Sequence, residues 1–402
     1  MLKHSNEPPQ VPGGGAMESS IYAHHVGGRA GTVIFPETSA FEGNIHHVIY
    51  DADPDCIDEI ATSWGKKATI LPYCLADKRS ESIFFVNLCP FTSSVLPFNN
   101  KFGEYYQKKH PLCHSDYLFK KAIEPQRELR LATEAIDQLF AEGRIPRVDF
   151  LSVDTQGSEL WILQGAERML ETTTVAVACE VNFDELYKGA PLFGELDAFM
   201  RAKGFLLASL EPMAFGYKRI PRAFRGPGFP VQGDALYILR PDSVSEMDPR
   251  VRAERLEKLA FCALAFGYPE LAHEAARLSF PAISTSGGAI GKFVREFYMM
   301  VEADSTLPPL WHECLEQQRA VEGGVSIPAK RSLPYPLRVV KKLITDPKGF
   351  LVALRNVRTR YMMRILVFLK LERLNFNGFE SFLAAHGFAQ AAKKVYFERL
   401  WF

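Results

Sequence analysis

From Ser20 to Pro241 the chain alternates short apolar runs, rich in β-branched residues, with amphipathic stretches of helical period. The apolar runs are typical of buried strands, and the amphipathic stretches are typical of helices that cover a sheet. Strands are predicted at 21–25, 46–51, 68–74, 82–86, 148–153, 175–181, 205–210 and 235–239. Helices are predicted at 57–64, 132–142, 158–170 and 193–203. This alternation predicts an α/β domain built on a mainly parallel, doubly wound sheet.

The pattern changes on either side of this domain. Residues 1–19 are polar and rich in Pro and Gly, which predicts a flexible N-terminus. Residues 242–402 show no strand alternation and predict an α-helical accessory region, with two helices in 249–278 and a helix broken at Gly387 in 379–402. Residues 89–125 fit neither period and predict a long functional loop or cover.

Composition narrows the class of protein. The 47 basic and 47 acidic residues cancel, so no global field favours a nucleic-acid partner. The seven cysteines are scattered without a Cys-x-x-Cys pair, which favours buried thiols in a reducing compartment over a disulfide framework or a metal site. The chain has no apolar run of spanning length, and residues 1–15 lack a signal-peptide core. We therefore predict a cytoplasmic protein without a metal.

Residues 330–373 contain twelve Lys or Arg against two acidic residues, with aromatic and aliphatic residues interleaved. A basic amphipathic segment can make a peripheral contact with an anionic membrane. It can also pack on the rest of the chain, and the neutral overall charge favours this second alternative. The oligomeric state is not indicated by the sequence.

Three polar sites follow predicted strands. Asp154 ends the run at 148–153, where the turn Thr-Gln-Gly leads into a helix. A glycine turn, Gly27-Gly28-x-x-Gly31, follows the first strand, and Asp51 ends the second. The glycines permit close approach of a nucleotide, and an acid at Asp51 can bind a ribose diol at the carboxyl edge of the sheet. A mobile glycine loop with an unrelated turn aspartate is the alternative.

The residues around Asp154 carry a family resemblance. The string Val-Asp-Phe-Leu-Ser-Val-Asp-Thr-Gln-Gly-Ser-Glu-Leu-Trp-Ile-Leu-Gln-Gly-Ala, at 148–166, resembles the signature of FkbM-type S-adenosylmethionine-dependent methyltransferases. Residues 91–97, 179–187 and 191–205 resemble that family in the right order, so the resemblance covers about 20–241. His25 departs from it, because the family usually has Asp there.

The resemblance implies a Rossmann-like fold and S-adenosylmethionine as cofactor. It implies that the methionine and ribose lie against His25, Gly27, Gly28 and Gly31, with Asp51 on the ribose hydroxyls and Asp77 near the adenine. A dehydrogenase that uses NAD would also suit the glycine turn and Asp51. The signature at 154–165 and the run around Glu180 disfavour it.

The resemblance also implies O-methylation of a hydroxyl on a sugar, glycan or secondary metabolite. Asp154 is the first candidate for the general base and Glu180 the second. Gln156, Asn182 and Tyr187 are candidates for binding the acceptor. Gln156 and Asn182 could equally hold turns, and packing in the core is the favoured alternative for Tyr187. The alternative function is a non-catalytic scaffold on a degenerate methyltransferase fold, since His25 replaces the usual acid.

Overall fold

The computed structural model describes residues 20–28, 35–36, 38–107, 117–284, 287–304 and 379–392. The chain divides into two compact units, the first ending at Tyr298 and the second beginning at Met299. Gly31 and the basic segment 330–373 lie outside the described residues, as does most of the second unit. No helix in the described ranges is long and apolar enough to span a lipid bilayer.

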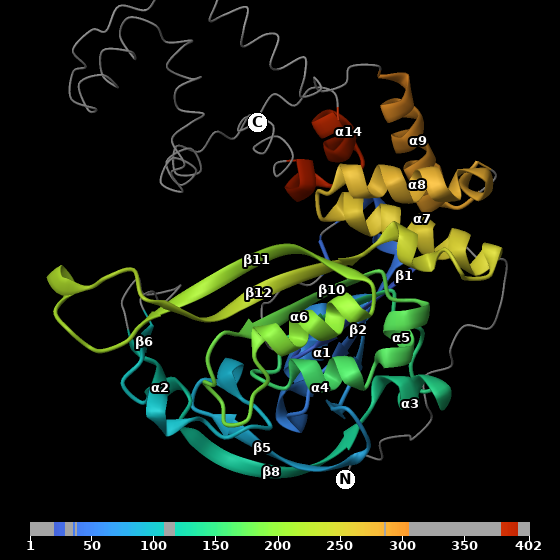
Figure 1. Ribbon diagram of the computed structural model, residues 1–402. Helices are drawn as coiled ribbons and strands as arrows, with labels where there is room; N and C mark the ends of the chain where they lie inside the picture. Colours follow the sequence, from blue (N-terminus) through green and yellow to red (C-terminus); the bar gives the residue numbers. More distant parts are fainter. Residues whose placement is uncertain are drawn as a thin grey trace, which may run out of the picture. The chain divides into compact units, whose positions relative to one another are not determined.

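A nine-stranded mixed sheet organises the first unit, in the order β3-β2-β1-β9-β10-β12-β11-β6-β7 (Figure 1). Its strands are β1 Ile21–Val26, β2 Ile45–Tyr50, β3 Ala68–Leu71, β6 Tyr106–Gln107, β7 Tyr117–Leu118, β9 Phe150–Val153, β10 Ala176–Asn182, β11 Phe205–Gly216 and β12 Phe229–Leu239. The five strands from β3 to β10 run parallel, as predicted. The other four pair antiparallel, so the sheet as a whole is mixed.

The register of the parallel strands determines where the site lies. Val26 of β1 pairs with Tyr50 of β2 on one side and with Val153 of β9 on the other. The next residue of each strand therefore lies at the same edge of the sheet. Every residue of β9 and β10 is buried, as expected for strands covered on both faces.

A second sheet of three strands, in the order β4-β8-β5, accounts for two wrong predictions. Its strands are β4 Cys74–Leu75, β5 Ser80–Asn87 and β8 Pro125–Glu134. The strand predicted at 68–74 is divided between the two sheets, with the break at Pro72, which has no amide hydrogen for a ladder. The helix predicted at 132–142 begins only at Ile136, because pairing with β5 extends β8 through Glu134.

Six helices lie between the strands: α1 Ile57–Trp64, α2 Phe119–Ala122, α3 Ile136–Ala141, α4 Glu159–Gln164, α5 Glu167–Thr172 and α6 Phe193–Ala202. The prediction for α1 is confirmed at both ends. The helix predicted at 158–170 is broken into α4 and α5 at Gly165. A Cβ at Gly165 would lie 2.1 Å from the carbonyl oxygen of Ala76, so only glycine permits this close approach.

Helices α7 Pro249–Ala265, α8 Pro269–Ile283 and α9 Ala289–Ala303 follow β12, and α14 Phe379–Ala385 lies in the second unit. Helix α7 packs on the amino ends of the central strands. Its Lys258 Nζ lies 2.8 Å from Asp149 Oδ1, just before β9. Its Arg255 donates to the carbonyl of Leu170 in α5 and to that of Thr174, just before β10. The helices placed after Pro241 by sequence thus begin inside the same compact unit as the sheet.

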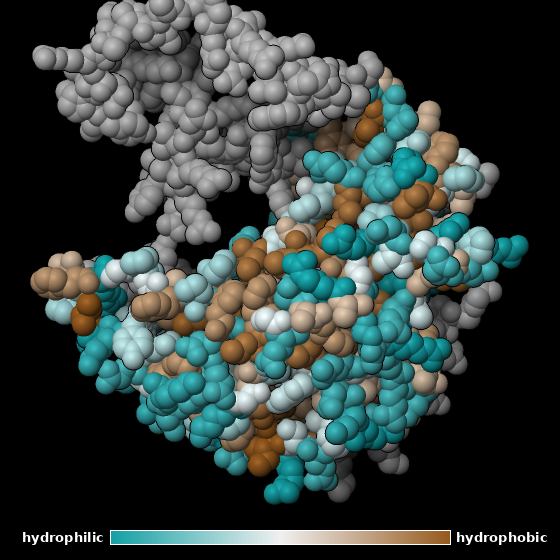
Figure 2. All heavy atoms as spheres, viewed as in Figure 1, coloured by the Kyte–Doolittle hydropathy of each residue, from teal (hydrophilic) through white to brown (hydrophobic). Residues whose placement is uncertain are grey.

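Phe261 extends this contact of α7 to the beginning of the chain. Its ring lies 5.1 Å from that of Phe41 and 6.2 Å from that of Phe35, measured between centroids. All three rings are buried. Apolar side chains are exposed at the outer end of the β11–β12 hairpin, where Phe224 is 76% and Phe229 is 60% exposed (Figure 2).

His24, fully buried on β1, predicts how the fold responds to acid. Its Nε2 donates to the carbonyl of Arg147 at 3.0 Å, so its Nδ1 accepts from the Tyr50 hydroxyl at 2.8 Å. Burial lowers the pKa of His24 from 6.5 to about 3. Stability tied to this group is therefore fully present above pH 6.5 and is lost as pH falls toward 3.

We expect the wild type to lose about 2–3 kcal/mol of unfolding free energy between pH 7 and pH 4.5 through this histidine. His24→Gln, which cannot be charged, should lose less over the same range in urea titrations. His46→Gln, at an exposed position of β2, is the control and should behave as the wild type. Equal acid sensitivity in His24→Gln and the wild type would contradict the assignment.

Candidate functional site

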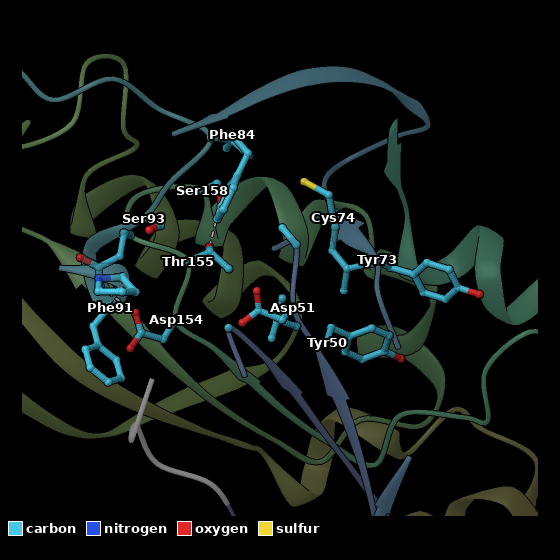
Figure 3. Close-up of a pocket in the computed structure, with 17 residues that line it drawn as sticks. Tyr50, Asp51, Tyr73, Cys74, Phe84, Phe91, Ser93, Asp154, Thr155 and Ser158 are labelled. Carbon is cyan, nitrogen blue, oxygen red and sulfur yellow. Dashed lines mark hydrogen bonds between the residues drawn. The ribbon is translucent and has the colours of Figure 1, made fainter. Parts of the chain in front are cut away.

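An open pocket with an empty volume of about 600 Å³ lies at the carboxyl ends of β1, β2 and β9 (Figure 3). This volume includes space that is open to solvent. Gly27, Asp51 and Asp154, the residues that follow the three strands, all line it. Phe84 of β5 and the loop carrying Phe91 supply an apolar wall. The predicted meeting of the three strand ends is therefore observed.

Gly27 holds these strand ends together and leaves no room for a side chain. Its φ is +96°, and a Cβ there would lie 2.0 Å from the carbonyl oxygen of Asp154. The amides of Gly27 and Gly28 both donate to the carbonyl of Tyr50 at 3.0 Å. The glycine turn thus brings β1 close to both β2 and β9 at the pocket.

Asp51 presents a buried acceptor to the pocket. The residue is 8% exposed, and its Oδ1 accepts from the amide of Asp53 at 2.9 Å. No donor among the described residues reaches Asp51 Oδ2. One carboxylate oxygen is therefore held in place while the other is available to a ligand.

Three of the residues implied for cofactor binding, His25, Gly28 and Asp77, do not line the pocket. His25 is 2% exposed, and its ring nitrogens lie 3.0 Å from Ser152 Oγ and 2.9 Å from the carbonyl of Gly27. His25 therefore supports the glycine turn from within the sheet. Asp77 is also outside the lining, with a side chain 43% exposed and 3.9 Å from Lys78. Their contacts with a cofactor, like that of Gly31, stay predictions.

A buried cluster of carboxylates adjoins the pocket at Asp154. Oxygens of Asp154, Glu159 and Glu180 lie within 4.8 Å of one another, and Asp234 faces Glu180 across the β10–β12 ladder. Burial is the largest cause of the raised pKa of each affected group, and the other carboxylates add to it. It raises the pKa of Glu180 well above 4.5, that of Glu159 to about 7 and that of Asp234 to about 6. The cluster therefore retains protons close to neutral pH.

Gln156 bridges this cluster. Its Nε2 donates to Asp154 Oδ1 at 2.8 Å and to Glu180 Oε2 at 2.9 Å, while its Oε1 lies 3.0 Å from the hydroxyl of Tyr187. Among the described residues it is the single non-glycine with a left-handed backbone, at φ +59°. Such strain persists where the surroundings hold the residue in place. The sequence-predicted residues Asp154, Gln156, Glu180 and Tyr187 thus form one connected group.

Asn182 lies on the same face of β10 as Glu180, since side chains alternate along a strand. The residue is 1% exposed, and neither its Oδ1 nor its Nδ2 has a hydrogen-bond partner in the part of the chain that the structure describes. A buried amide without hydrogen-bond partners lowers the stability of the fold, because its lost contacts with water are not replaced.

Sequence reasoning missed two members of the cluster. Glu159 is the first residue of α4, a position where an acid is favoured by the helix dipole. In the structure its carboxylate accepts from the amides of Thr155 and Gly157 and so fixes the turn after β9. The sequence signal that could have identified Glu159 as a site residue is its position five residues after Asp154. Asp234 carried no such signal, because only pairing between β10 and β12 brings it beside Glu180.

Comparison with known families agrees with this geometry. Residues 35–207 match the model of the methyltransferase FkbM domain. The match includes Asp51 and the cluster residues Asp154, Glu159 and Glu180, whereas β1 and its glycine turn precede it. No curated protein and no solved structure matches the chain.

Proposed function

We propose, from the premise that residues 35–207 form an FkbM methyltransferase domain, that this protein is an S-adenosylmethionine-dependent O-methyltransferase. The observation that carries the proposal is the convergence of Gly27, Asp51 and Asp154 on one pocket. The strand order supports a Rossmann-like interpretation, because it reverses between β1 and β9, where open α/β sheets bind ligands. The proposed acceptor is a hydroxyl of a sugar, glycan or secondary metabolite.

The pocket suits the cofactor's ribose and its reactive end. Asp51 Oδ2 can accept hydrogen bonds from the ribose hydroxyls, and a charged acceptor makes such bonds strong. Gly27 lets the ligand approach the backbone closely. When bound, S-adenosylmethionine would supply a methyl group on a sulfonium centre.

Asp154 is the proposed general base. Asp154 would take the proton of the acceptor hydroxyl as that oxygen attacks, while the bound cofactor would supply the methyl group and its sulfur would keep the electrons of the broken carbon–sulfur bond. Orientation of the two reactants supplies much of the rate enhancement. Gln156 positions the Asp154 carboxylate, and Glu180 is the second candidate base.

Asp51→Ala should weaken binding of S-adenosylmethionine by more than about tenfold, because the ribose loses a charged acceptor. Isothermal titration calorimetry with the cofactor and with S-adenosylhomocysteine measures the effect. Asp58→Ala, an exposed acid on the adjacent helix α1, is the control and should bind as the wild type.

Two outcomes would overturn the proposal. Absence of binding of either compound by the wild type would favour a non-catalytic scaffold on this fold. Binding of NAD in their place would favour a dehydrogenase, which the glycine turn and Asp51 also suit.

A further inference from the structure

Two carboxylates of the cluster, Glu159 and Glu180, are buried with little to balance a negative charge. Glu159 is 2% exposed and Glu180 is 8% exposed, and neither pairs with a Lys, Arg or His among the described residues. Both instead accept from uncharged amides: Glu159 from the backbone at Thr155 and Gly157, and Glu180 from side chains. Buried charges are ordinarily paired or coordinate a metal.

The spacing of the oxygens suits a shared cation. One oxygen from each of Asp154, Glu159 and Glu180 lies within 4.8 Å of the other two. Oxygen ligands bind divalent cations at about 2.0–2.6 Å, so two ligands of one ion are separated by about 5 Å at most. The three oxygens can therefore ligate one ion with only small movements of their side chains.

Asn182 supplies an independent indication. In the β10–β12 register Asn182 is opposite Gln232, and Gln232 Nε2 reaches Glu180 Oε2 at 3.1 Å. Asn182 therefore projects beside the carboxylate of Glu180, and both polar atoms of its buried amide lack a partner within the described ranges. Its Oδ1 is a ligand of the kind that hard divalent cations accept, directly or through a water molecule.

We propose that Asp154, Glu159 and Glu180 bind one divalent cation, Mg²⁺ or Mn²⁺, with the amide of Asn182 as an additional oxygen donor. Carboxylate and amide oxygens are the donors these ions prefer over thiolate or imidazole. The ion lies at the pocket wall, because Asp154 lines the pocket. A carboxylate has two oxygens, so coordination through one leaves the other for the proton of an acceptor. Only this last role rests on the proposed function.

Electron paramagnetic resonance of the full chain, stripped with EDTA and titrated with Mn²⁺, tests the site without any cofactor. We expect one bound Mn²⁺ per chain, displaced by Mg²⁺. Glu180→Gln should weaken binding by at least about tenfold, because even loss of an outer partner of a metal ligand has that effect. Glu211→Gln removes an exposed acid from the neighbouring strand β11 and should bind Mn²⁺ as the wild type does.

No bound Mn²⁺ at millimolar concentration, or unchanged binding in Glu180→Gln, would overturn the site. If a thermal melt shows that Glu180→Gln does not fold, Mn²⁺ binding is measured in Asp154→Asn instead, and the same weakening is expected. Calorimetry with S-adenosylmethionine, in EDTA and in Mn²⁺, is read separately. Cofactor binding without Mn²⁺ binding would refute only the metal site, and Mn²⁺ binding without cofactor binding would refute only the proposed methyl transfer.

Discussion

Asp154→Asn is expected to lower methyl transfer by about 10²–10⁴-fold, the usual contribution of a general base. The amide keeps the shape of the carboxylate but cannot take the proton of the acceptor hydroxyl. Its Oδ1 can still accept from Gln156 Nε2, so the bridge to Glu180 should remain. The measurement is single-turnover transfer of a labelled methyl group to an acceptor found by screening sugars and polyketide-type alcohols.

Two controls separate chemistry from structure in this experiment. The melting temperature and the affinity for S-adenosylhomocysteine should change little in Asp154→Asn, because the backbone contact with Gly27 is unaffected. Turnover close to that of the wild type would move the role of base to Glu180 or leave Asp154 with positioning alone.

Lys258→Met should lower the free energy of unfolding by about 3–5 kcal/mol, as expected when one partner of a buried ion pair is removed. Lys258 and Asp149 have side chains 3% and 0% exposed, and their charged atoms lie 2.8 Å apart. Without Lys258, Asp149 keeps a contact with Arg147 but remains buried beside the amino end of β9. Urea unfolding of the full chain measures the loss.

Arg277→Met is the matched control, because Arg277 pairs with Glu274 on the exposed face of α8. It should change stability by about 1 kcal/mol or less. The double variant Lys258→Met/Asp149→Asn should recover part of the loss, since an amide oxygen can still accept from the backbone of Tyr22. A loss in Lys258→Met no larger than in the control would show that the pair of Lys258 with Asp149 contributes little to the stability of the fold.

The residues that follow strands were predictable from sequence. Apolar runs locate the strands, and in a parallel sheet the carboxyl ends of strands meet at one edge, so Gly27, Asp51 and Asp154 could be expected together. The residues brought in by antiparallel pairing could not. Asp234 reaches the cluster through the register of β10 with β12, and no local pattern encodes that register.

The wrong helix boundary near Ala132 has a similar origin. Residues 132–134 suit a helix in their own sequence, yet Ser80 pairs with Thr133 and extends β8 to Glu134. Partners distant in sequence override local propensity in such a segment. The inward position of His25, hydrogen-bonded to Ser152, also depends on pairing between β1 and β9.

The contact of Phe41 with Phe261 has a consequence for synthesis of the chain. From position 41 to position 261 the ribosome adds 220 residues, which takes roughly 10–45 s at ordinary elongation rates. During that time the apolar surface around Phe41 lacks the helix that buries it. Nascent chains halted before α7 should therefore be bound by chaperones that recognise exposed apolar segments, and release should follow once Phe261 has emerged. We therefore expect the nascent chain to need chaperones until α7, which lies beyond the matched family domain, has been synthesised.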